Sequence, residues 1–89
     1  MTQWRLEYDK TVVRWLRKAD PQTAKRIRDS LTAVVQTGNP RSRGHALTGV
    51  LAGLWRYRVG DYRIICDIHD QRVVVLVLEV GTRDHIYDG

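Results

Sequence analysis

Residues 54–87 read LWRYRVGDYRIICDIHDQRVVVLVLEVGTRDHIY, and this stretch decides the fold. It contains three runs rich in β-branched and aromatic residues, separated by two short polar breaks, which is typical of an antiparallel meander. The first break is Gly60-Asp61. Glycine at the first of two loop positions suits a type II′ turn, which fixes the register of the hairpin around it. The turn therefore predicts that Val59 lies opposite Tyr62.

The same register places three arginines on one face of the hairpin. Arg58 lies across from Arg63, and Arg56 follows two residues along the same face. Like charges directly opposite each other are unfavourable unless an anion neutralises them, so three converging guanidinium groups form a candidate phosphate site. The alternative is a solvated sheet face without a ligand. The other face of the hairpin is apolar and predicts the core: Trp55, Tyr57, Val59, Tyr62, Ile64, Cys66 and Ile68.

Length and composition indicate a single domain, residues 1–89. The formal net charge is +5 and arginine far outnumbers lysine, which favours a polyanionic partner such as nucleic acid, or an acidic protein. The sequence has no membrane-spanning run and no signal peptide, so we expect a cytoplasmic protein without a membrane partner. The lone cysteine falls within an apolar strand and predicts a buried thiol. The three histidines lack metal-ligand spacing, so we expect no metal site and no cofactor.

The N-terminal half predicts a strand followed by two helices. Alternating residues 4–8 indicate a half-buried strand, which we place at an edge of the sheet. Asp9 offers an N-cap for a first helix that runs to about Ala19. Asp20-Pro21 starts a second helix, and the glycine of Gly38-Asn39-Pro40 ends it.

Residues 39–53 form a connector, and residues 73–80 form the third strand. We expect Leu47, Val50 and Leu51 to anchor the connector in the core. Its polar residues Arg41, Arg43 and His45 either extend the basic surface or belong to a solvated loop. The third strand is apolar on both faces, which places it in the middle of the sheet.

These elements predict an α+β sandwich: a helical hairpin covers one face of a mostly antiparallel sheet of about four strands. The other face is left open. Continuing the register through the second turn predicts an apolar floor on that open face, beside the arginines. An uncovered floor of this kind marks a groove that another molecule fills. Its predicted residues are Ile65, Val74, Leu76, Leu78 and Val80.

Three segments resemble the RelE/ParE toxin superfamily. They are LTG at residues 47–49, WRYRVGDYRIICDI at residues 55–68 and VGTRDHIY at residues 80–87. The element order of strand, helical hairpin and meander also matches over the whole chain. RelE-type toxins are ribosome-dependent endoribonucleases of type II toxin–antitoxin modules, and they cleave messenger RNA in the ribosomal A site. The resemblance therefore implies a toxin that inhibits translation.

The resemblance also implies roles for individual residues. Arg63 corresponds to the arginine of the family's Y-R motif, Arg83 to the arginine after the last strand, and Tyr87 to the terminal tyrosine that stacks on or orients a base. Arg56 and Arg58 stand where RelE itself has two lysines. We therefore expect Arg58, Arg63, Arg83, Tyr87 and His85 to be catalytic. The expected RNA-binding residues are Arg56, Arg58, Arg41 and Arg43.

The implied reaction is attack of a ribose 2′-hydroxyl on the adjacent phosphodiester, which leaves a 2′,3′-cyclic phosphate and a 5′-hydroxyl. Arginine cannot act as the base, so the two replaced lysines put the proton acceptor in doubt. His85 has suitable chemistry, and Tyr87 or the RNA of the ribosome are competitors. The sequence shows no carboxylate and histidine pair of the kind that independent ribonucleases use, which fits dependence on the ribosome.

The family further implies a hetero-oligomer with a cognate RelB-like antitoxin, whose acidic amphipathic segment wraps the basic face. Two alternatives to the nuclease remain. One is a ParE-like toxin that inhibits DNA gyrase without nuclease activity, and the other is an inactive relative that only binds. The combination of Arg63, Arg83 and Tyr87 with a basic hairpin favours the nuclease.

Overall fold

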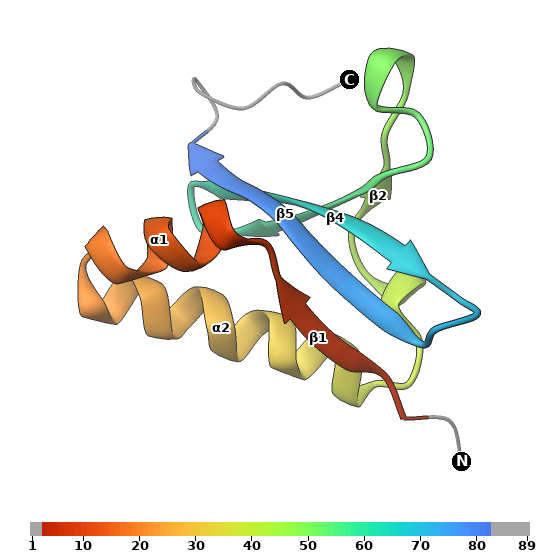
Figure 1. Cartoon of the computed structure of the whole chain (residues 1–89), viewed down its shortest axis with the longest axis horizontal. Helices are drawn as coiled ribbons and strands as arrows, with labels where there is room; N and C mark the ends of the chain where they lie inside the picture. Colours follow the sequence, from red (N-terminus) through yellow and green to blue (C-terminus); the bar gives the residue numbers. More distant parts are fainter. Residues whose placement is uncertain (1–2, 83–89) are drawn as a thin grey trace.

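Two helices lie under one face of a five-stranded sheet (Figure 1). The computed structural model describes residues 3–82. The predicted α+β class is confirmed, with a helical hairpin on one side of a mostly antiparallel sheet. The elements are β1 (Arg5–Tyr8), α1 (Lys10–Lys18), α2 (Pro21–Gln36), the short 3-10 turn η1 (Pro40–Ser42), β2 (His45–Ala46), a second 3-10 turn η2 (Gly49–Leu51), β3 (Trp55–Val59), β4 (Tyr62–His69) and β5 (Val74–Thr82).

Both helices begin at the aspartates that the sequence indicated. The Asp9 carboxylate accepts a hydrogen bond from the Thr11 amide at 3.0 Å and caps α1. Asp20 does the same for the Thr23 amide at 3.1 Å and caps α2. Each cap satisfies an amide that has no partner within the first helical turn. The boundaries predicted from these caps are confirmed.

The strand order is β1-β5-β4-β3-β2. The first strand lies at an edge, as predicted, and it runs parallel to β5, whereas all other pairs are antiparallel. The estimate of about four strands missed β2, which consists of His45 and Ala46 and pairs with the start of β3. A two-residue strand has too few positions to show an alternation of polar and apolar residues. The sequence of the connector therefore did not predict β2.

The hairpin of β3 and β4 has the predicted register. Val59 pairs with Tyr62, Arg58 pairs with Arg63, and Gly60 has a φ of +58°, which the first position of a type II′ turn requires.

The register between β4 and β5 contains a bulge. Cys66 pairs with Val77 whereas Ile65 pairs with Glu79, so Leu78 is an extra residue on β5. The bulge shifts the residues beyond it to the other face of the sheet. The prediction for Val80 was therefore wrong: this side chain packs among the helices rather than on the open face.

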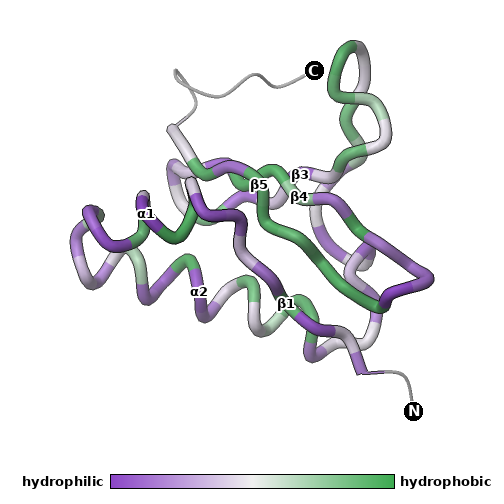
Figure 2. Tube along the Cα trace, viewed as in Figure 1, coloured by the Kyte–Doolittle hydropathy of each residue, from purple (hydrophilic) through white to green (hydrophobic). Residues whose placement is uncertain are grey.

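The main core lies between the helices and the sheet. Its fully buried members include Ile27, Leu31, Ile64, Cys66 and Val77. Burial raises the pKa of the Cys66 thiol, which behaves here as a small apolar side chain, as predicted. In Figure 2 the hydrophobic colour is concentrated on β5 and on one side of each helix.

A smaller apolar cluster lies on the opposite face. Leu47 and Ile65 are buried there, and Leu51 and Leu54 pack against them. The segment around η2, which rises above the sheet in Figure 1, thus covers part of the face that we expected to be open. The prediction for Val50 was wrong, because this side chain is 81% exposed. Within residues 3–82, no helix is both long enough and apolar enough to cross a membrane.

Candidate active site on the open sheet face

A row of two arginines and a glycine crosses three strands on the face opposite the helices. Arg58 of β3 pairs with Arg63 of β4, which pairs with Gly81 of β5. Arg63 is only 9% exposed and is the one buried charged residue among residues 3–82, whereas Arg58 is exposed. Gly81 has no side chain that competes for the space above β5. The row therefore combines a sheltered guanidinium with a solvent-facing one.

A second row runs beside the first and crosses four strands. It consists of His45 on β2, Arg56 on β3, Ile65 on β4 and Glu79 on β5. Paired residues project from the same face, and strands lie about 4.8 Å apart, so the row spans about 14 Å. His45 and Glu79 are exposed, and neither side chain makes a hydrogen bond or ion pair within residues 3–82. The arginines are thus flanked by an imidazole on one side and a carboxylate on the other.

A cleft of about 270 Å3 opens at the free edge of β3. It exists because β2 pairs only with Trp55 and Arg56, so residues 57–59 have no neighbouring strand on that side in the described structure. The predicted residues Arg43, Arg56 and Arg58 all line this cleft. The remaining lining residues are Ser30, Leu31, Val34, Gly44, His45, Tyr57 and Val59.

Two aromatic side chains of β3 hold the connector in place around the cleft. The Trp55 indole donates to the carbonyl of Arg43 at 2.7 Å, and the Tyr57 hydroxyl donates to the carbonyl of Pro40 at 2.6 Å. Burial raises the pKa of Tyr57, which keeps this donor protonated. These two bonds fix the backbone before Gly44 against the sheet and so position Arg43, while the pairing of β2 with β3 positions His45.

Comparison with known proteins identifies the family. Residues 6–87 match the family model for the ParE toxin of type II toxin–antitoxin systems. The chain belongs to the RelE/ParE toxin superfamily. The toxin is similar to a chain of the RelBE2 toxin–antitoxin complex of Mycobacterium tuberculosis, with a TM-score of 0.81 and 26% identity over 91% of this chain and 99% of that chain. No curated protein sequence matches it.

Two further solved structures share the fold. A chain of the archaeal RelE–RelB complex from Pyrococcus horikoshii OT3 has a TM-score of 0.71 and 27% identity, over 97% of this toxin and 100% of that chain. The isolated RelE toxin of E. coli has a TM-score of 0.70 and 21% identity, over 89% of this toxin and 83% of that chain. The E. coli structure, at that identity, indicates a common fold only.

The structure does not bring Arg41 together with the other arginines of the toxin. Its guanidinium forms two hydrogen bonds with Asp70, at 2.8 and 2.9 Å, in the turn between β4 and β5. That turn lies at the opposite end of β4 from Arg63. The bonds from Arg41 lower the pKa of the Asp70 carboxyl and raise the pKa of Arg41 itself. Arg41 thus links two loops in the structure.

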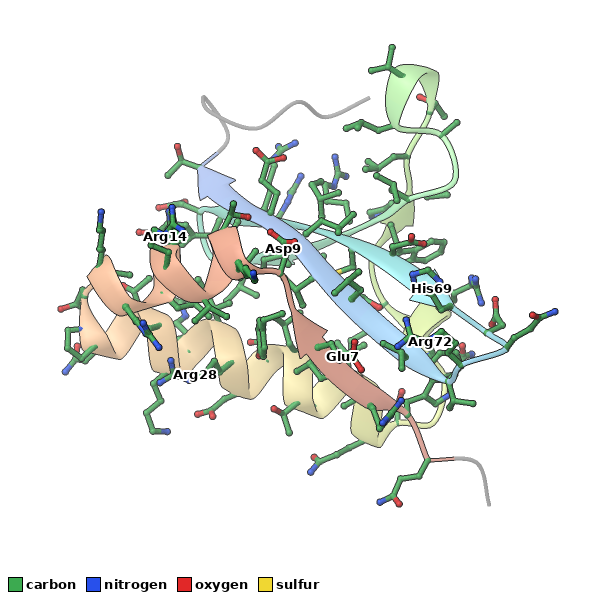
Figure 3. All side chains as sticks on the ribbon, in the orientation of Figure 1. Glu7, Asp9, Arg14, Arg28, His69 and Arg72 are labelled. Atoms are coloured by element: carbon green, nitrogen blue, oxygen red, sulfur yellow. The ribbon has the colours of Figure 1, made fainter. Side chains whose placement is uncertain are left out.

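A carboxylate and a histidine also lie together on β4, which the sequence analysis did not note. His69 Nε2 lies 3.1 Å from an Asp67 carboxylate oxygen on β4. Residues two apart on a strand project from the same face, so the spacing of Asp67 and His69 predicts that their side chains are neighbours. It lies at the far end of the open face, where Arg72 also approaches Glu7 at 3.7 Å (Figure 3). This second polar group is separate from the arginine rows.

Sequence reasoning also missed Arg26 on α2, whose guanidinium lies beside the Gly60 turn. Helical spacing places Arg26 away from the core, and no local signal links it to the hairpin. The predicted residues Arg83, His85 and Tyr87 lie outside the described residues. Among residues 3–82, no group of three or more side chains is arranged to hold a metal ion.

Proposed function

We propose that this toxin is a ribosome-dependent endoribonuclease that cleaves messenger RNA in the A site and so inhibits translation in the cytoplasm. The observation that supports the proposal most is the pairing of Arg58 with Arg63 on the open sheet face. Guanidinium groups on neighbouring strands present hydrogen-bond donors that match the oxygens of a phosphate diester. A scissile phosphate is such a group.

The arginines stabilise the extra negative charge of the transition state. During attack of the 2′-hydroxyl, charge develops on the phosphorane oxygens, and fixed positive groups in a sheltered site stabilise it strongly. Arg63 is the more effective of the two because its burial lowers the local dielectric constant. In this proposal Arg83 adds a further cation and Tyr87 stacks on a base. Arg43 and Arg56 bind neighbouring phosphates at the cleft.

The proposal is tested by inducing the toxin in cells and mapping messenger RNA ends within open reading frames. We expect codon-phased cleavage that decreases at least about 100-fold in Arg63→Ala and in Arg83→Ala, because each change removes a group that binds the transition state. Arg72→Ala is the matched control, since it removes an exposed arginine at the far end of the sheet. Intact messages in cells that express the wild-type toxin would contradict the proposal.

We further propose that a RelB-like antitoxin covers the same face in a hetero-oligomer. The solved relatives from M. tuberculosis and P. horikoshii are toxin–antitoxin complexes. An acidic amphipathic segment complements both the arginine rows and the apolar residues between them. Binding of the antitoxin then competes directly with binding of RNA.

A second candidate function is inhibition of DNA gyrase without nuclease activity. It is favoured by the family model itself, which describes the ParE toxins. The same induction experiment separates the two functions. A gyrase inhibitor leaves messages intact and causes gyrase–DNA breaks to accumulate.

A further inference from the structure

Strand β3 has a free edge where its backbone has no neighbour. The two residues of β2 pair only with the start of β3, so no described strand lies beside residues 57–59 on that side. In a hairpin with a two-residue turn, the pair next to the turn exchanges backbone hydrogen bonds and the next pair does not. Val59 therefore faces β4, and the N–H and C=O of Arg58 face the free edge. Within residues 3–82, Arg58 has no other hydrogen-bond partner.

The cleft beside this edge has an apolar wall and a basic wall. On the helix side, Leu31 and Val34 of α2 line it together with Val59. Among the described residues that line the cleft, none is acidic. An occupant therefore meets an unpaired backbone, an apolar surface and positive charge. The basic wall consists of Arg43, His45, Arg56 and Arg58.

An extended peptide strand matches all three features. Its backbone offers an acceptor and a donor to the two free groups of Arg58, as in any antiparallel ladder. Its side chains point alternately to the two faces, so they reach the apolar wall and the basic wall in turn. A helix uses its backbone groups internally and leaves those of Arg58 unpaired. Addition of a strand to an exposed edge is also a common mode of peptide recognition.

We propose that the acidic partner of the proposed hetero-oligomer adds an antiparallel strand to the free edge of β3, an inference that rests on that part of the proposed function. This direction is the one in which β2 already pairs with β3. The partner residue opposite Arg58 shares its face and is an aspartate or glutamate, because opposite charges at paired positions attract. The residues on either side of it are apolar and contact Val34 and Val59.

The added strand fills the cleft in which the proposed function places RNA phosphates. Its acidic side chains take the positions beside Arg43 and Arg58 that those phosphates would occupy. Strand addition is therefore a second point, next to the open face, at which the partner excludes RNA.

The test uses a short synthetic peptide of alternating valine and glutamate as the probe. We expect it to bind the toxin and to slow hydrogen exchange of the Arg58 amide, measured by NMR, at least about 10-fold. In the proposed pairing the glutamate amides face β3 and the valine amides face solvent. N-methylation of the glutamates should therefore weaken binding at least about 10-fold, and N-methylation of the valines should leave binding unchanged.

Variants of the toxin test where the peptide binds. Ser30 of α2 lines the cleft and is half-buried, so Ser30→Trp fills the space of the added strand and should weaken binding at least about 10-fold. Thr32→Trp is the matched control, because it places the same side chain at an exposed position of α2 outside the cleft. Arg43→Glu, at the exposed rim, should weaken binding of the glutamate peptide and allow binding of a valine–lysine peptide.

Three results would overturn the strand addition: no binding of the peptide, equal weakening by the two methylations, or wild-type binding by Ser30→Trp. A single-stranded RNA oligonucleotide that slows exchange at Arg58 when the peptide does not would also overturn it and assign the edge to RNA. None of these measurements involves RNA cleavage or the antitoxin. Failure of the strand addition therefore leaves the nuclease function and the hetero-oligomer intact, and each of those is tested separately.

Discussion

At Gly44 the backbone has a φ of +83°, and a side chain there would collide with the sheet. A Cβ atom would lie 2.6 Å from the Trp55 indole nitrogen and 2.9 Å from the Tyr57 ring, and it would overlap the carbonyl of Arg56. Glycine is therefore needed both for its conformation and for the close approach of the connector to β3. The position of the neighbouring residue His45 depends on this contact.

Gly44→Ala should destabilise the toxin by more than about 1 kcal/mol, because alanine at positive φ is strained and the collision adds to the strain. Gly38→Ala is the matched control, since Gly38 has a similar φ of +78° but nothing within 4 Å of its would-be Cβ. Urea denaturation of both variants measures how much each change lowers the free energy of unfolding. Equal losses of unfolding free energy in the two variants would show that the contact of Gly44 with β3 does not contribute to stability.

At the scale of elements, the connector is held to the sheet at several points rather than by strand pairing alone. Only His45 and Ala46 belong to β2, and the rest of the connector depends on side chains. The pair of Arg41 and Asp70 is one such link, and it joins η1 to the turn between β4 and β5. Both side chains are largely exposed, so water screens their attraction and the link is weak.

Asp70→Asn should lower the melting temperature slightly at pH 7, and the difference from wild type should disappear in acid. The pKa of Asp70 in the folded toxin lies below the ordinary value of 3.8, chiefly because of its hydrogen bonds with Arg41. The contribution of this carboxylate is therefore complete above about pH 4 and is lost as the pH falls through the lower, folded-state pKa. Thermal unfolding from pH 7 to pH 2 provides the measurement.

The same link can be checked by a double-variant cycle. Adding Arg41→Gln to Asp70→Ala should leave the melting temperature where Asp70→Ala puts it, because the alanine already removes both hydrogen bonds and the charge. A melting difference that persists at pH 2 would mean that Asp70 acts by packing rather than by charge.

For the whole molecule, the excess positive charge is spread over both faces. Helix α1 has four exposed cations and no acidic residue. At 100° per residue these cations fall within an arc of about 100° opposite Val12 and Leu16, the buried side of the helix. None of the four makes an ion pair in the described structure. The side away from the arginine rows is therefore also attractive to a polyanion. The four residues are Lys10, Arg14, Arg17 and Lys18.

Under the proposed function, the salt dependence of the toxin's binding to ribosomes should reflect these helix cations. A triple change of Arg14, Arg17 and Lys18 to glutamine should reduce the slope of log affinity against log salt by about 2 to 3, because each phosphate contact contributes about 0.7 to 0.9. The matched control changes Arg5, Lys25 and Arg41 to glutamine, three cations that already have carboxylate partners. Equal slopes for the two triple variants would mean that only net charge matters.

Much of the fold and half of the candidate site were predictable from local patterns. The aspartate caps define both helices, because a carboxylate satisfies free amides within three residues of itself. The Gly60-Asp61 turn fixes the pairing of Arg58 with Arg63, because a two-residue loop allows one register. Alternation along β3 and β4 then separates the basic face from the core. Each of these features depends on residues that are close in the chain.

Tertiary structure alone decided the rest of the site. The Leu78 bulge sets which face of β5 carries Glu79, and the two-residue strand β2 brings His45 opposite Arg56. The pairing of Arg63 with Gly81, eighteen positions along the chain, likewise depends on the register between β4 and β5. These arrangements result from contacts between segments that are far apart in the chain. Their pairing register cannot be predicted from neighbouring residues, because loop length and packing set that register together. The sequence by itself determined the pairing of Arg58 with Arg63, and only the folded sheet placed His45 and Glu79 on the same face as that pair.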